Sequence, residues 1–287
     1  MLRLLIALLA FGTLAGCNRS KPATSAQYAV TGTVISIDKN TQSAMIDTDE
    51  IKGFMAPMIM SYKVRNGKDL GSLAPGDSLS AELIVQGNDY WLDNIRVTQK
   101  AAASPPAKNA FHMPSPGEEV PDFKLLNQGG QHVSLTQYRG KVLMLTFIYT
   151  RCPFPDFCPR VSEQFAELNR RLAANPALYA KTHLLSISFD PKYDTPKVLR
   201  DYGHQWAGKQ ATVFDHWEFA AASANQVPEI AQFFGLTVTP ETGENVITHS
   251  LSTAVIGPDG KIVRWYHGSD WRASDLLTDA TGAAGKL

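Results

Sequence analysis

The sequence predicts a small all-β barrel followed by an α/β domain, because two different hydrophobic patterns occupy the two halves of the chain. Residues 28–99 contain short alternating strands broken by turn residues, whereas residues 118–287 alternate buried strands with amphipathic helices. Between them, residues 100–117 form a linker rich in Pro, Ala and Ser. With 287 residues, the chain is long enough to form two hydrophobic cores.

The first domain is predicted to close on itself. Turn residues, such as those at 75–77 and 87–89, separate its apolar runs. Five strands of this length favour an OB-like barrel. The predicted strands are residues 28–38, 43–47, 58–64, 78–85 and 90–98.

The second domain is predicted to begin with a hairpin, residues 121–126 and 132–135, followed by a buried strand, 141–149. A helix should follow, since apolar residues repeat there at helical spacing and Pro159 suits a first turn. The remaining predicted elements are a strand at 184–189, a helix from 196, a short strand at 211–214, a helix at 227–234, paired strands at 247–256 and 261–266, and a helix at 273–280. This order is typical of a thioredoxin-like fold.

The amino terminus has the pattern of an export signal. A short basic lead precedes a nearly continuous apolar run, residues 4–14, and small residues precede Cys17. The run is shorter than the roughly 20 residues that a membrane-spanning helix needs. Because L-A-G-C resembles a bacterial lipobox, we expect residues 1–16 to be a signal peptide and Cys17 to carry lipid, with residues 17–27 as a tether. The predicted location is extracytoplasmic and membrane-anchored; Asn18 favours the outer membrane over the inner, and the choice stays open.

Charge and cysteine content limit the classes of function that the chain can have. Twenty-seven basic residues balance 27 acidic ones without a Lys/Arg cluster, which argues against a nucleic-acid partner. With Cys17 lipidated, Cys152 and Cys158 remain as a pair in an oxidising compartment. A structural disulfide, a redox pair and a metal site are all compatible with that pair.

Methionines cluster in the predicted barrel. Met55, Met58 and Met60 lie within six residues of one another, and Met58 and Met60 would face the same side of a strand. Thioether sulfur is a soft ligand suited to Cu(I), although Met also fills gaps in hydrophobic cores.

This stretch resembles the copper-binding domain of the CusF type, whose hallmark is Met-x-Met preceded by a histidine and a tryptophan. Thr48 stands at the position of that histidine and Met55 at the position of the tryptophan. The resemblance implies a second copper site at Met58 and Met60, with Met55 as a third sulfur. We expect weak Cu(I) binding there; the alternative is a barrel that serves only for docking or spacing.

Several motifs of the second domain resemble the Sco/SenC family: F-I-Y-T-R-C-P, the C-P that closes the cysteine loop, D-P-K-Y-D-T-P, T-H-S and G-P-D-G-K. The resemblance implies a copper site at Cys152, Cys158 and His249. It also implies a role in building the CuA centre of cytochrome c oxidase, with the oxidase subunit that carries CuA and a thioredoxin-like reductant as partners. The family usually places three residues between its cysteines, whereas five separate them here.

The chemistry of these side chains agrees with that implication, since two thiolates and an imidazole accommodate both Cu(I) and Cu(II). Cys158, next to the predicted helix, is expected to have the lower thiol pKa of the pair. Oxidation to a disulfide would compete with metal binding. The alternative function is therefore a thiol-disulfide oxidoreductase that reduces the cysteines of an acceptor protein.

Two carboxylates follow the strand next to the cysteine loop. Asp194 or Thr195 is expected to cap the helix that opens at Pro196. Asp190 and Asp194 are both expected either to cap that helix or to order the loop before it. A supporting contact from Asp190 to the metal ligands is a weaker reading.

Overall fold

The computed structural model describes residues 25–39, 42–55, 57–86, 89–101, 112–210, 213–240, 247–269 and 271–285. The predicted signal peptide, Cys17, the first part of the predicted tether and residues 102–111 of the predicted linker lie outside the described residues. Within the described ranges, no helix combines the length and the apolar character needed to cross a bilayer.

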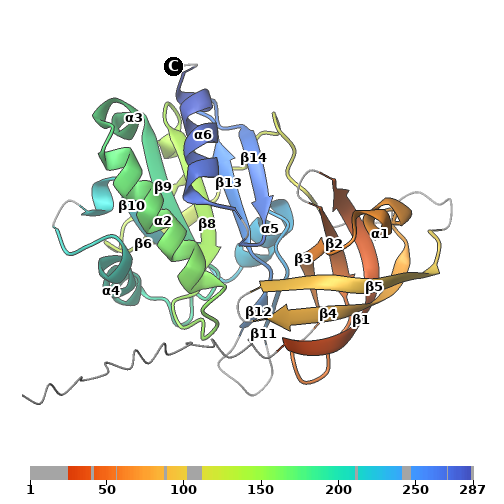
Figure 1. The fold of residues 1–287 in the computed structure, drawn as a ribbon. Helices are drawn as coiled ribbons and strands as arrows, with labels where there is room; N and C mark the ends of the chain where they lie inside the picture. The colour runs from red at the N-terminus through yellow and green to blue at the C-terminus, as the bar shows by residue number, and fades with distance from the viewer. Residues whose placement is uncertain are drawn as a thin grey trace, which may run out of the picture.

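Five strands form a closed barrel in the order β1-β2-β3-β5-β4, which confirms the predicted all-β domain (Figure 1). Strand β1 is long and pairs with both β2 and β4. At Gly32 the strands approach so closely that an added Cβ would lie 2.3 Å from the Asp47 carbonyl oxygen, so only glycine fits. The strands are β1 (Ser25–Asp38), β2 (Ser43–Thr48), β3 (Met58–Val64), β4 (Ser78–Gln86) and β5 (Asp89–Gln99).

A short helix, α1 (Gly67–Ser72), joins β3 to β4 and was not predicted. The Asn66 side chain caps it by accepting a hydrogen bond from the Lys68 amide at 3.0 Å. Asn-Gly is also a common turn sequence, because the Asn side chain serves turns and helix caps equally well. The sequence therefore indicated that β3 ends here, but not that a short helix follows it.

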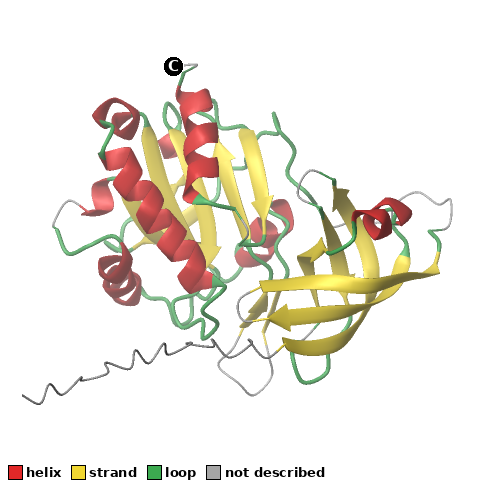
Figure 2. Cartoon of the chain, in the orientation of Figure 1, coloured by secondary structure: helices red, strands yellow, loops and turns green. Residues whose placement is uncertain are grey.

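The second domain is built on a seven-stranded sheet with the order β14-β13-β8-β9-β10-β6-β7. Its central strands β8 and β9 run parallel and are buried along their whole length, as the predicted apolar runs require. Helices α2 and α6 lie against the same face of this sheet (Figure 1), and Figure 2 shows the helices gathered around it while the barrel is almost all strand. The strands are β6 (Lys124–Asn127), β7 (His132–Ser134), β8 (Val142–Ile148), β9 (Thr182–Ser188), β10 (Trp217–Ala222), β13 (Ser252–Ile256) and β14 (Ile262–His267).

The helices agree with the apolar periodicity. Helix α2 buries Val161, Phe165 and Leu172 against the sheet, while Arg170 and Arg171 pair with Glu167 on its outer face. Helix α4 opens at Pro196 as predicted. The helices are α2 (Cys158–Ala173), α3 (Pro176–Ala180), α4 (Pro196–Trp206), α5 (Val227–Phe233) and α6 (Ala273–Ala284), with 3-10 turns at Leu135–Tyr138 and Val213–Asp215.

Two predicted strands were wrong. Residues 213 and 214 of the strand expected at 211–214 lie in a 3-10 turn, and residues 211 and 212 lie outside the described residues. The next strand is β10, Trp217–Ala222, whose run of alanines has low strand propensity but is buried between β9 and β6. The continuous strand expected at 247–256 is divided at residues 250–251. Its first part, β12 (Ile247–His249), pairs with β11 (Val238–Pro240) in a separate two-stranded sheet.

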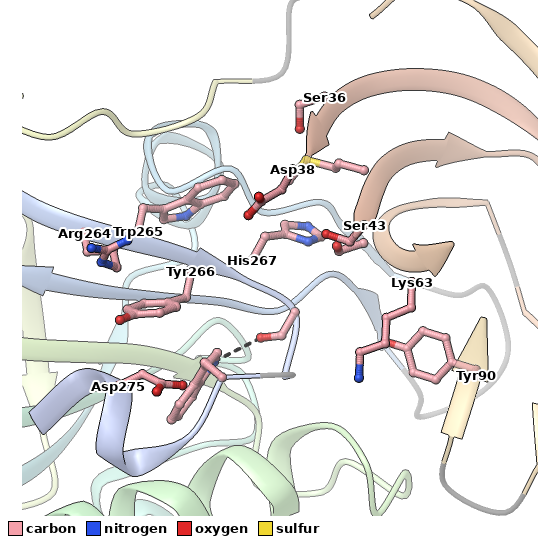
Figure 3. Close-up of a pocket in the computed structure, with 14 residues that line it drawn as sticks. Ser36, Asp38, Ser43, Lys63, Tyr90, Arg264, Trp265, Tyr266, His267 and Asp275 are labelled. Atoms are coloured by element: carbon pink, nitrogen blue, oxygen red, sulfur yellow. Dashed lines mark hydrogen bonds between the residues drawn. The ribbon is translucent and has the colours of Figure 1, made fainter. Parts of the chain in front are cut away.

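A pocket of about 440 Å³ lies between the barrel and β14 (Figure 3). Asp38, Ser43 and Lys63 of the barrel face Trp265 and His267 across it. Neither cysteine of the predicted metal site lines this pocket, and His249 does not line it either.

Candidate metal centre

The cysteine loop follows the end of β8. The Cys152 amide donates to the Tyr149 carbonyl oxygen at 3.2 Å, which turns the chain out of the strand. A second turn follows, in which the Phe157 amide donates to the Phe154 carbonyl oxygen at 3.1 Å. Helix α2 then begins at Cys158. The extra residues of the loop are taken up by this second turn, so the loop still brings its two sulfur atoms to one place.

His249 reaches the same place from the other end of the domain. It ends β12, and the next amide, that of Ser250, still donates to the Thr237 carbonyl oxygen at 3.0 Å, in register with the β11–β12 pairing. The imidazole is only 2% exposed. Aromatic rings surround it, with centroids 4.6 Å away for Phe189 and 5.3 Å away for Tyr149. The ring is therefore fixed in an apolar wall, and few orientations are open to it.

The sulfur atoms of Cys152 and Cys158 and a ring nitrogen of His249 all lie within 4.8 Å of one another. The Cys158 Sγ lies 3.6 Å from the His249 Nε2. Ligand atoms about 2.0–2.3 Å from one ion cannot be more than about 4.6 Å apart, so a small side-chain movement suffices to place all three around an ion.

The hydrogen bonding of His249 also suits a metal ligand. Its Nδ1 lies 2.8 Å from the Ser250 carbonyl oxygen, which can only accept. The proton of the neutral ring is therefore on Nδ1, and Nε2 presents its lone pair toward the sulfurs. The residues present fit a soft or borderline ion such as copper.

The two thiols differ in acidity in the opposite sense from the prediction. A hydrogen bond from Cys158 lowers the pKa of Cys152 by more than burial raises it. Burial raises the pKa of Cys158, and the neighbouring Cys152 raises it further. Cys158 is completely buried at the first position of α2, and this loss of solvation outweighs the favourable helix terminus. Cys152, the more exposed of the two, is the thiolate of the metal-free pair.

Asp194 orders the cysteine loop and does not cap α4, which is the role of the Thr195 side chain. Its carboxylate accepts hydrogen bonds from the Thr150 amide at 3.1 Å, from the Thr150 hydroxyl, and from the Ser188 hydroxyl. It thereby ties the residues before Cys152 to the end of β9. Of the two caps predicted for α4, Asp194 and Thr195, the structure has Thr195.

Asp190 also contacts the cysteine loop, at Arg151, the residue after Thr150. It pairs with Arg151, with an Oδ2 to Nε distance of 3.0 Å, and its own amide donates to the Ser188 hydroxyl. Through Arg151 it holds the cysteine loop, and among the described contacts it does not reach the three candidate ligands.

The barrel methionines lie around β3. Met55 and Met60 pack against the barrel core, and Met58 is buried. Thr48 pairs with Met58 across the β2–β3 ladder and donates to its carbonyl oxygen at 2.6 Å. This places Thr48, which occupies the position of the CusF-type histidine, directly beside the Met-x-Met motif.

Comparison with known proteins matches both domains. Residues 112–283, more than half of the chain, match the SCO1/SenC family model. The chain belongs to the SCO1/SenC family. Residues 27–97 match the family model of the copper binding periplasmic protein CusF.

Individual relatives agree with the SCO1/SenC assignment. The chain is 31% identical over 170 residues to the SCO1 protein homolog of Bacillus subtilis (strain 168), a match that covers 58% of this chain and 83% of that protein. The solved structure of BsSco, described as a member of the Sco family of cytochrome c oxidase assembly proteins, is 27% identical with a TM-score of 0.50, and covers 61% of this chain and 99% of that one. A SCO1/SenC family lipoprotein from Bacillus anthracis str. Ames has the same fold, with a TM-score of 0.51 at 22% identity over 60% of this chain and 99% of that one.

Cys152, Cys158 and His249 are here called the SCO1/SenC site. Sequence patterns did not identify the residues whose hydrogen bonds hold the cysteine loop of this site in place. Thr150 and Ser188 carry no pattern that separates them from other hydroxyl residues, and only the structure joins them through Asp194. The sequence patterns do not single out Tyr149 either. Its place directly before Thr150, at the end of a buried strand, was the available signal.

Proposed function

We propose that this protein binds one copper ion through Cys152, Cys158 and His249 and delivers it to the CuA-carrying subunit of cytochrome c oxidase. The observation that carries the proposal is the convergence of two sulfurs and an available imidazole nitrogen within 4.8 Å, in a chain of the SCO1/SenC family. Copper is here the cargo that the protein transfers.

The arrangement suits ligand exchange. Cys158 and His249 are buried, whereas the Cys152 side chain is partly exposed. Among the three candidate ligands, Cys152 is therefore the one that an acceptor ligand can reach from solvent. Because thiolates and imidazole together accept both Cu(I) and Cu(II), either oxidation state can be carried.

Transfer can be tested directly. Full-length protein, loaded in part with Cu(I) and in part with Cu(II), is mixed in at least two-fold excess with the metal-free CuA-bearing domain. CuA absorption is then expected on the acceptor, because its two-metal site takes one ion in each oxidation state and offers additional ligands. Absorption spectra and metal analysis of the separated proteins provide the measurement. Copper retained entirely by the SCO1/SenC protein, with an acceptor whose thiols are reduced, would contradict delivery.

A version of this experiment with an oxidised acceptor tests the second function, thiol-disulfide oxidoreduction. The lowered pKa of Cys152 favours it, since a thiolate attacks a disulfide and Cys158 is near enough to resolve the mixed disulfide. An acceptor supplied with an oxidised cysteine pair would then be reduced by the metal-free protein, and Cys152 and Cys158 would become oxidised. That result without copper transfer would identify the protein as a reductase.

We also propose a weaker Cu(I) site in the barrel, supported by the match to the CusF family and by the position of Met58 and Met60 on one strand. Replacing both by leucine, which conserves volume and apolar character, is expected to lower Cu(I) uptake from two ions per chain to one. Equilibrium dialysis against a Cu(I) chelator measures the stoichiometry. Met144→Leu, in the buried strand β8, is the matched control and should leave uptake unchanged. Equal uptake by the double variant and the unaltered protein would make the barrel a structural module.

The proposed location is the extracytoplasmic side of a membrane, with lipid on Cys17. The match to a periplasmic protein and the likeness to a lipoprotein of the same family support it. A lipid anchor would hold the copper site close to membrane-embedded oxidases.

A further inference from the structure

Tyr149 carries a buried hydroxyl group without a hydrogen-bond partner. Its side chain is 0% exposed, and its hydroxyl makes no hydrogen bond within normal limits to any residue that the structure describes. An unsatisfied buried polar group typically costs about 1–3 kcal/mol. A phenylalanine would fill the same space without that cost, so the hydroxyl calls for an explanation.

The hydroxyl belongs to the wall of the metal centre. The Tyr149 ring meets the His249 ring edge to face, with centroids 5.3 Å apart at an angle of 87°. Burial, and then the charge of Cys152, raise the pKa of Tyr149. The Cys152 amide donates to the Tyr149 carbonyl oxygen at 3.2 Å, and the Cys152 sulfur lies within 4.8 Å of the His249 nitrogen, so Tyr149 contacts two of the three candidate ligands. A thiolate sulfur accepts hydrogen bonds, and the side-chain movement that closes the three ligands around an ion would also move the Cys152 sulfur relative to the hydroxyl.

We propose that Tyr149 is a positioning residue whose hydroxyl donates a hydrogen bond to the Cys152 thiolate when copper is bound, and so sets the balance between Cu(I) and Cu(II). This inference rests on the proposed function. Hydrogen bonds to a coordinating sulfur withdraw electron density from it and tune the reduction potential of the metal. Because thiolate sulfur carries more negative charge beside Cu(I) than beside Cu(II), the hydrogen bond favours the reduced ion.

Tyr149→Phe removes only the hydroxyl and tests this role. The full-length variant is expected to bind one copper ion at the SCO1/SenC site, with its Cu(II)–thiolate absorption band at longer wavelength. Its preference for Cu(I) over Cu(II) should fall about 10-fold, a decrease in potential of about 59 mV for one electron. The metal-free variant should be as stable as the unaltered protein or more stable, since no existing hydrogen bond is lost.

Tyr138→Phe is the matched control. Tyr138 is also buried, but it precedes the opposite end of β8 and its hydroxyl donates to Glu218. This variant should lose stability and keep the copper band and the potential.

The outcomes separate the inference from the proposed function. A Tyr149→Phe protein that binds one copper with an unaltered band and potential would overturn the role of the hydroxyl alone. If the unaltered protein binds no copper through its cysteines, both the proposed function and this inference fail. A shift of equal size in Tyr138→Phe would show a general effect of losing a buried hydroxyl and would also overturn the inference.

Discussion

Cys158→Ser is expected to abolish tight copper binding at the SCO1/SenC site. The substitution removes the sulfur that lies 3.6 Å from the His249 Nε2, and a serine hydroxyl is a hard, protonated ligand that Cu(I) does not favour. Loss of residues that merely support metal ligands already lowers affinity about 10–100-fold, so loss of a ligand should exceed the upper end of that range. Metal analysis of the reduced, full-length variant after competition with a Cu(I) chelator measures the effect.

Cys17→Ser is the matched control, since Cys17 is the remaining cysteine of the chain. It should leave copper stoichiometry unchanged while releasing the protein from membranes. His249→Ala should retain copper on two sulfurs with reduced affinity. Stoichiometric, chelator-resistant copper at the second domain of Cys158→Ser would show that the three residues do not form the site.

Asp194→Ala is expected to destabilise the second domain by about 3 kcal/mol. The carboxylate is 1% exposed and accepts from the Thr150 amide and from the Thr150 and Ser188 hydroxyls, all of which would lose this acceptor. Burial raises the pKa of Asp194, whereas the Ser188 and Thr150 hydrogen bonds lower it. Removing the buried charge therefore recovers part of its desolvation, which is why the expected loss is smaller than the sum of separate hydrogen-bond penalties.

Urea unfolding followed by tryptophan fluorescence measures this change, because Trp217 and Trp271 are buried in the second domain. Asp201→Ala, an exposed carboxylate paired with Lys197 on α4, is the control and should alter stability by less than about 0.5 kcal/mol. The loosened loop should also weaken copper binding about 10-fold. Asp194→Ala with the same unfolding midpoint as the control would mean that Thr150 and Ser188 find other partners.

Sequence patterns predicted most of the architecture because burial and periodicity are properties of neighbouring residues. The runs that became β8 and β9, and the apolar stripe of α2, needed no knowledge of distant contacts. The pattern failed where tertiary contacts decided the outcome. The alanines of β10 became a strand because β9 and β6 flank them, and residues 247–249 form a separate strand because they pair with β11.

The candidate site was predictable in its members but not in its electrostatics. Cys152 and Cys158 are close in sequence, yet His249 lies 91 residues beyond Cys158, and only the T-H-S motif pointed to it. A helix terminus beside Cys158 is visible in sequence, whereas its complete burial is not. The order of thiol acidity was therefore wrong. The role proposed for the Tyr149 hydroxyl depends on its contact with His249, which is distant in sequence.

The hairpin of β11 and β12 is hydrogen-bonded as a sheet of its own, apart from the seven strands that support the cysteines. A movement of this hairpin as a unit would therefore break no backbone hydrogen bond of the main sheet and would carry His249 away from both sulfurs. It would also give up the packing of the imidazole against Phe189 and Tyr149, which holds the third ligand in place. An ion released in this order would lose its nitrogen first and remain on the two sulfurs.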